Sequence, residues 1–113
     1  MDDFQIDLVN DIAVIKVNIL TATHRDAKPL WEEMESKLMF NHKKIIIDLS
    51  FCNNVDSTFI GMIVKIFRKV QANDGKMKMV YPEVKNTEVF IVTGIPKIID
   101  FYNTLEEALD SFE

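Results

Sequence analysis

A run of β-branched residues near the middle of the chain constrains the fold more than any other segment. Residues 43–49 read Lys-Lys-Ile-Ile-Ile-Asp-Leu, so a strand formed here would carry apolar side chains on both faces. Such a strand needs cover on both sides, as a central strand of a parallel or mixed sheet has. The run is also far too short to span a bilayer, which needs about 20 apolar residues. We therefore expect a sheet with helices packed against it and no membrane insertion.

The segments on either side alternate between strand spacing and helix spacing. Residues 4–9 and 12–17 alternate with a period of about two around the turn signal Asn10-Asp11, which predicts an N-terminal hairpin. Farther along, apolar residues three and four apart predict helices, and further alternation predicts two more strands. The predicted helices cover residues 26 to about 41, 58 to about 71, 82–94 and a short segment after Thr104, and the predicted strands cover residues 76–81 and 98–102.

Residues with special backbone preferences indicate where these elements begin and end. Pro29 lacks a backbone N–H, so we place it in the first turn of its helix. Gly94 suits a left-handed C-terminal cap, and Thr104 with Glu107 forms a capping-box pattern. The order of elements predicts one α/β domain over residues 1–113, in which a mixed central sheet opened by the hairpin carries about four helices.

Charge and composition exclude several classes of function. The net charge of -5, from 13 Lys+Arg and 18 Asp+Glu, argues against binding to nucleic acid or an anionic membrane surface. We also expect no basic patch beside Trp31, as stacking on nucleic acid would need. One cysteine, Cys52, and two histidines give no metal-ligand spacing, and no glycine-rich phosphate loop is present, so no metal or cofactor is expected. The acidic N-terminus has no signal-peptide pattern, which favours a cytoplasmic protein.

The junction of residues 53–58 is the candidate functional site, because a buried strand there leads into a helix. In open α/β sheets, sites lie beyond the carboxyl ends of the strands. Asp56 or Ser57 is placed to cap the helix, which is a purely structural role. Ser57 would also present a hydroxyl where the helix dipole and free N–H groups can accommodate a phosphate. The two roles are compatible.

The helix after this junction carries two apolar stripes. One stripe is sufficient to dock the helix on the sheet, and a second, formed by Phe59, Met62 and Ile66, lies about 100° around the helix axis from it. The second stripe is either buried under a neighbouring helix or left as a docking face beside Ser57. The first stripe consists of Ile60, Ile63, Phe67 and Val70.

These motifs together resemble the STAS domain family. Residues 45–50, Ile-Ile-Ile-Asp-Leu-Ser, followed by residues 55–61, Val-Asp-Ser-Thr-Phe-Ile-Gly, are similar to the family's apolar strand and its Asp-Ser-Ser/Thr-Gly-Leu-Gly motif. Residues 92–95, Val-Thr-Gly-Ile, resemble the family's Ser/Thr-Gly-Leu segment, and residues 104–109 resemble its closing helix. The resemblance covers essentially the whole chain in order.

The resemblance implies a regulator of the kind called bacterial anti-sigma factor antagonists. In these proteins the serine directly after the aspartate is phosphorylated, which corresponds to Ser57 here. The kinase would be an ATP-binding anti-sigma factor, and a metal-dependent serine phosphatase would reverse the modification. The unphosphorylated protein would hold the anti-sigma factor and free the sigma factor. We expect no enzymatic activity: no nucleophile elbow is present, and no spacing brings Ser57 and His24 together as a catalytic pair.

The chain departs from the family pattern at two places that bear on its partner. Phe59 stands where the family commonly has glycine, and residues 20–23, Leu-Thr-Ala-Thr, stand where many members have Gly-Glu/Asp-Leu/Ile-Asp. A binding module that docks constitutively on a transport ATPase or another signalling protein, without phosphorylation, is the alternative function. The predicted partner-binding residues are Asp56, Ser57, Thr58, Phe59, Met62, Ile66, Thr21 and Thr23.

Overall fold

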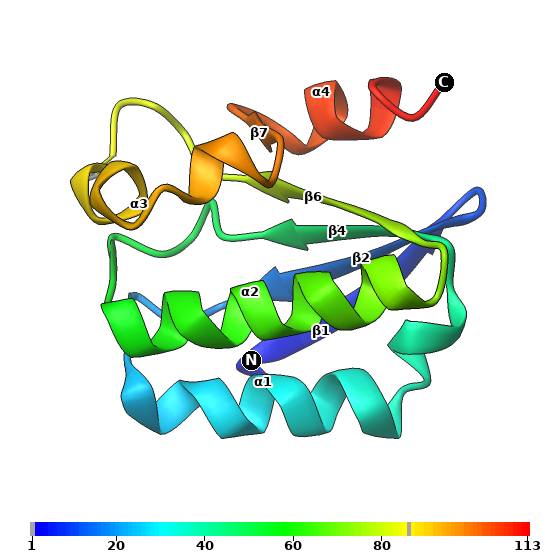
Figure 1. The fold of residues 1–113 in the computed structure, drawn as a ribbon, viewed down its shortest axis with the longest axis horizontal. Helices are drawn as coiled ribbons and strands as arrows, with labels where there is room; N and C mark the ends of the chain where they lie inside the picture. The colour runs from blue at the N-terminus through cyan, green and yellow to red at the C-terminus, as the bar shows by residue number, and fades with distance from the viewer. Residues whose placement is uncertain (1, 86) are drawn as a thin grey trace.

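The computed structural model describes residues 2–85 and 87–113, and a five-stranded mixed sheet forms its centre (Figure 1). The first two strands pair antiparallel, and the remaining strands pair parallel to one another and to the second strand. The predicted N-terminal hairpin is therefore confirmed. In spatial order the strands are β1 (Phe4–Val9), β2 (Ile12–Val17), β4 (Lys44–Asp48), β6 (Lys76–Val80) and β7 (Phe101–Tyr102).

Three helices cover one face of the sheet, and a fourth covers part of the other (Figure 1). Each parallel connection moves one strand further in the same direction, and right-handed crossovers then bring the connecting helices to the same face. None of the helices in the described part of the chain is both long and apolar enough to cross a membrane. The helices are α1 (His24–Ser36), α2 (Ser57–Ala72), α3 (Glu88–Thr93) and α4 (Leu105–Asp110), with short 3₁₀ turns η1 (Met39–Asn41) and η2 (Ile95–Lys97).

Strand β4 is the central strand that the isoleucine run predicts. Ile45 and Ile47 belong to the core beneath α1, α2 and α3, whereas Ile46 belongs to the smaller core beneath α4. All three side chains are fully buried. The mixed α/β architecture with four α-helices is thus confirmed, and the run is apolar on both faces because both faces are covered at this point.

The first helix differs from the prediction at both ends. It begins at His24, because the N–H of Thr23 donates a hydrogen bond of 2.9 Å to the carboxylate of Asp26 and caps the first turn. Pro29 consequently lies in the second turn, and its predicted place in the first turn is wrong. The α-helix ends at Ser36, and the rest of the predicted span contains a residue with positive φ, Leu38.

The third helix and the last strand are shorter than predicted. After Pro82 the chain makes a turn in which the N–H of Lys85 donates to the Pro82 carbonyl, so α3 begins at Glu88 instead. Gly94 ends the helix with φ of +74°, as predicted. Beyond it the chain winds into η2, where Ile99 bonds back to the Ile95 carbonyl, and this leaves only Phe101–Tyr102 to pair with the sheet.

Candidate functional site

A two-stranded parallel pairing builds the backbone of the site. The short strands β3 (Thr21–Ala22) and β5 (Asn54–Val55) pair with each other, and the N–H of Asp56 donates a 3.0 Å bond to the Ala22 carbonyl. The 20–23 loop and the 53–58 junction are therefore held side by side. The sequence gives no signal for this pairing, because two residues are too few to show a strand period.

One carboxylate holds the N-termini of two helices together. Asp56 is the N-cap of α2: its Oδ1 accepts a 2.8 Å bond from the N–H of Phe59. Its Oδ2 accepts a 2.9 Å bond from the N–H of His24, the first residue of α1. A negative charge at a helix N-terminus is favourable by about 0.3–1 kcal/mol per helix when exposed. The His24 imidazole lies beside the same oxygen, with Nδ1 3.9 Å away.

Ser57 is the first residue of α2 and is exposed. Because Asp56 supplies the capping oxygen, the Ser57 hydroxyl is not needed for the cap, and no hydrogen bond to it is found in residues 2–85 and 87–113. Asp56 thus caps the helix, and the neighbouring Ser57 presents an exposed hydroxyl. Thr58, the next residue of α2, is exposed as well.

The expected exposure of the second stripe of α2 is wrong for two of its three residues. Phe59 and Ile66 are fully buried, and only Met62 is partly accessible. The physical reason is α1, which packs beside α2 on the same face of the sheet and covers this stripe (Figure 1). Phe59 and Ile66 are therefore core residues and are not available to a partner.

The exposed apolar side chain next to Ser57 is Val92 of α3, a helix whose outer side also exposes Ile91. Val92 is 77% exposed and Ile91 is 66% exposed. Ser57 lines a shallow hollow of about 330 Å³ with four residues of α3. The sequence predicts a helix here, but its pattern cannot show that the outer side of the helix faces solvent. The four residues are Glu88, Val89, Val92 and Thr93.

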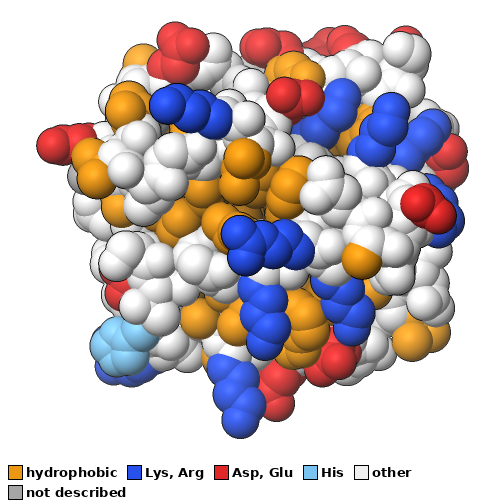
Figure 2. All heavy atoms as spheres, viewed as in Figure 1, with side chains coloured by type: hydrophobic (Ala, Val, Ile, Leu, Met, Phe, Trp, Pro, Cys, Tyr) orange, Lys and Arg blue, Asp and Glu red, His pale blue; other side chains and the backbone are white. Residues whose placement is uncertain are grey.

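Trp31 has basic neighbours, contrary to the sequence-based expectation. The ammonium groups of Lys65 and Lys69 lie 4.6 and 4.9 Å from the centre of its ring, from the adjacent helix α2. Figure 2 shows Lys and Arg side chains grouped over the surface that α1 and α2 form. The contacts are cation–π interactions, which cover the ring rather than leave it open for stacking.

Cys52 is a buried thiol in the loop between β4 and β5. Its Sγ donates to the carbonyl of Val17 at 3.7 Å, and burial raises the pKa of the thiol to about 11. A thiol with this pKa remains protonated at neutral pH and is a poor nucleophile. In the described part of the chain, no three His, Cys, Asp or Glu side chains are grouped so that they could hold a metal ion.

Comparison with known proteins gives one family and several similar structures. The STAS domain family matches residues 8–108. A Thermotoga neapolitana protein provisionally named an anti-sigma factor antagonist is 28% identical over 114 residues, which cover 97% of each chain. The crystal structure of a Thermotoga maritima protein with the same provisional function matches with a TM-score of 0.84 at 24% identity, covering 96% of this chain and 92% of the other.

The anti-sigma factor antagonist SpoIIAA has the same fold in two states. Its unphosphorylated form matches with a TM-score of 0.76 at 22% identity, over 96% of this chain and 95% of that one. The phosphorylated form of the Bacillus protein matches with a TM-score of 0.70 at 20% identity, over 97% of this chain and 99% of that one.

Proposed function

The chain belongs to the STAS domain family, and we propose that it is a phosphorylatable partner-switching regulator, an anti-sigma factor antagonist. In this proposal it binds an ATP-dependent anti-sigma serine kinase while Ser57 is unmodified and releases it once Ser57 carries a phosphate. A metal-dependent serine phosphatase returns the protein to its binding state. All three proteins act in the cytoplasm, and this chain contributes no catalytic residue.

The observation that carries the proposal is that Asp56 caps the helix while the neighbouring Ser57 keeps an exposed hydroxyl. A serine that capped its own helix would have its hydroxyl oxygen held against the backbone and turned away from a kinase. Here Asp56 keeps both of its bonds, so the Ser57 hydroxyl can change without loss of the cap. The provisional names of the Thermotoga relatives, and the existence of SpoIIAA in both phosphorylation states, support the same reading.

A phosphate on Ser57 would be tolerated by the domain and opposed by a packed interface. The N-terminus of the 16-residue helix α2 favours the added charge of about -1.5 to -2. At an interface the same group is bulky, must lose its water, and is repelled by the carboxylate of Asp56. A net cost of about 3 kcal/mol would weaken binding more than a hundredfold.

The proposed partner surface combines the hydroxyl-bearing junction with the exposed side of α3. Ser57 and Thr58 lie at its centre, and Thr21 and Thr23 come from the loop paired with the junction. Val92 supplies the apolar contact that Phe59 and Ile66 cannot supply. Asp56 has a positioning role, since both of its oxygens are engaged inside the domain. Met62, partly accessible on α2, lies in the same helix as the serine.

Incubation with the cognate ATP-binding partner and ATP, followed by mapping of the modified residue, tests the proposal. We expect one phosphate, on Ser57, and loss of tight binding when it is added. Ser57→Ala should bind constitutively and Ser57→Asp should bind poorly, and both should melt close to the parent protein. Thr58→Ala is the matched control, because it removes the neighbouring exposed hydroxyl and should leave phosphorylation unchanged.

Phosphate on another residue, or no phosphate at all, would contradict the switch. If the unmodified protein still binds its partner in that case, the constitutive binding module becomes the better description.

A further inference from the structure

A second polar site lies on the opposite face of the sheet from α1, α2 and α3. Side chains alternate along a strand, and Ile12 and Val14 of β2 face α4, so Lys16 continues on that same face. Asp48 follows Ile46 in β4 in the same way. The short helix α4 covers the apolar positions but does not reach these two charged ones.

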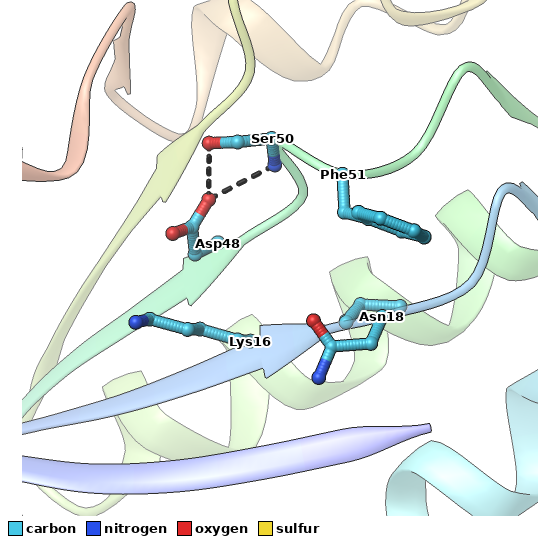
Figure 3. Close-up of a pocket in the computed structure, with 6 residues that line it drawn as sticks. Lys16, Asn18, Asp48, Ser50 and Phe51 are labelled. Atoms are coloured by element: carbon cyan, nitrogen blue, oxygen red, sulfur yellow. Dashed lines mark hydrogen bonds between the residues drawn. The ribbon is translucent and has the colours of Figure 1, made fainter. Parts of the chain in front are cut away.

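A pocket of about 350 Å³ opens at this place, at the carboxyl ends of β2 and β4. This volume lies at the lower end of the range for small-ligand sites, and the edge beyond the carboxyl ends of parallel strands is where such sites usually lie. Figure 3 shows the polar side chains of its lining and the exposed ring of Phe51 at its edge. The lining residues are Lys16, Val17, Asn18, Asp48, Ser50 and Phe51.

Asp48 is the one charged residue found buried among the described residues, with 7% exposure, and half of its carboxylate is unused. Oδ1 accepts bonds from the N–H and from the hydroxyl of Ser50, at 2.9 and 2.5 Å. No donor to Oδ2 is found in residues 2–85 and 87–113. In Figure 3 this second oxygen carries no dashed line and lies on the side of Lys16.

Lys16 and Asp48 are directly paired across β2 and β4, yet their charges do not form an ion pair. The ammonium of Lys16 instead lies 3.8 Å from Asp7 on β1, and Asp48 is turned toward Ser50. Two opposite charges thus border one pocket without neutralising each other. No side-chain oxygen without a partner is enclosed in the described part of the chain, so the Oδ2 atom of Asp48 can be reached from the pocket.

The remaining polar atoms of the pocket are mostly acceptors. The Asn18 amide nitrogen donates to the carbonyl of Asp2, which leaves its oxygen turned toward the pocket (Figure 3). The Ser50 hydroxyl donates its hydrogen bond to Asp48, so its oxygen remains available as an acceptor. Asp48 Oδ2 therefore suits an N–H donor of a primary ammonium group, Asn18 Oδ1 and Ser50 Oγ add further acceptors to the lining, and Lys16 suits a carboxylate.

We propose that this pocket binds a small zwitterion that carries a primary ammonium and a carboxylate, namely a free α-amino acid. The ammonium occupies the space next to Asp48, and the carboxylate occupies the space next to Lys16. A ligand with both charges complements both protein groups at once, with its carboxylate sharing Lys16 with Asp7, which neither a simple cation nor a simple anion can do. Its side chain faces the ring of Phe51. Asn18 and Ser50 stand just before the segments that carry the paired strands β3 and β5, so the ligand touches both segments, the second of which leads to Ser57.

The proposal is tested by titrating the isotope-labelled full chain with each common L-amino acid separately and following its amide resonances. We expect at least one of them to give saturable shifts at Asn18 and Ser50. The N-acetyl derivative of that amino acid lacks the ammonium, and its carboxamide lacks the carboxylate. Each loses a charge-assisted contact and should bind about tenfold more weakly to the unchanged protein.

Variants of the protein provide the complementary arm. Asp48→Asn and Lys16→Gln should each weaken binding about tenfold, and Lys16→Gln should abolish the preference for the acid over its carboxamide. Lys44→Gln is the matched control, because Lys44 has the same 37% side-chain exposure and also pairs with an aspartate, yet lies outside the pocket. It should bind like the parent protein.

Two results would overturn the proposal. One is the absence of saturable shifts with every amino acid up to about 10 mM, a concentration well above the range of useful affinities. The other is binding that the two ligand analogues and Lys16→Gln leave unchanged, which would place the ligand elsewhere. If Asp48→Asn fails to fold, the analogues decide the outcome, since they are measured on the unchanged chain.

Discussion

The two helices next to Ser57, α2 and α3, differ in how far their apolar side chains are buried. Helix α2 buries Phe59 and Ile66 completely, whereas α3 leaves Ile91 and Val92 largely exposed. Both helices contact the same sheet, but α2 also has α1 along its side, and in the described part of the chain no helix covers the outer side of α3 (Figure 1). Whether an apolar residue is core or surface is thus decided by the number of neighbouring elements rather than by the helix's own spacing.

The largest difference between the helices should appear in stability. Phe59→Ala removes a fully buried ring from α2, and we expect the free energy of unfolding to fall by about 3–5 kcal/mol. Val92→Ala on α3 should change it by no more than about 0.5 kcal/mol. Urea denaturation measures both values. If both variants lost the same free energy of unfolding, the difference in burial between Phe59 and Val92 would not determine their contributions to stability.

The two N-caps offer the next contrast. Asp56→Ala removes two bonds to backbone N–H groups, one in each of two helices, and should lower the free energy of unfolding by about 2 kcal/mol. Thr87, the N-cap of α3, makes no side-chain cap bond, so Thr87→Ala should be close to neutral. Thermal melting compares the pair. An Asp56→Ala protein as stable as the parent would mean that water replaces the carboxylate without loss.

For partner binding we expect the reverse: substitution of an exposed residue of α3 should matter more than substitution of a buried residue of α2. Val92→Glu places a charge on the exposed side of α3 next to Ser57 and should raise the Kd for the ATP-binding partner about tenfold or more, while the melting temperature stays the same. Calorimetric titration gives the Kd. Leu8→Glu controls for a charge added to an exposed apolar site, since Leu8 is also exposed but lies on β1. An unchanged Kd for Val92→Glu would remove α3 from the proposed interface.

The smallest contrast concerns the glycines of the two helices. Gly61 lies within α2 and Gly94 ends α3, and within 4 Å a Cβ at either position would meet no atom beyond its chain neighbours and the backbone of its own helix. Gly61→Ala should raise the free energy of unfolding by up to about 1 kcal/mol, because alanine is the better helix former. Gly94→Ala should lower it by about 1 kcal/mol, because φ is +74° there. Opposite signs in chemical denaturation are the expected result, and equal signs would contradict the backbone explanation.

Long periodic segments were predictable from the sequence, because their own residues carry the information. The hairpin and α2 repeat a spacing, β4 is a continuous run of apolar residues, and Gly94 marks a helix end through its own backbone freedom. The junction with Ser57 was likewise predictable, from the step between a buried strand and a helix. The resemblance to a known family then gave the serine its expected role.

Features that depend on distant segments could not be predicted in this way. The burial of Phe59 requires knowledge of where α1 packs, and the two-residue pairing of β3 with β5 has no period to detect. The late start of α3 depends on the turn from Pro82 to Lys85. The ammonium of Lys85 donates to the carbonyl of Cys52, a residue far away in the sequence. The open half of the carboxylate of Asp48 is visible only once the neighbouring strand is in place.

The bonds around Asp56 also bear on the time course of the proposed partner switch. Its carboxylate ties two helix ends, and its N–H is fixed to Ala22, so the backbone beneath Ser57 is ordered before a partner arrives. Association with such a surface costs little loss of chain freedom and proceeds as an encounter of two nearly rigid bodies. Changes in affinity then fall mainly on the dissociation rate. Modification of the serine would accordingly act as a timer, which shortens how long each complex lasts and leaves the frequency of encounters almost untouched.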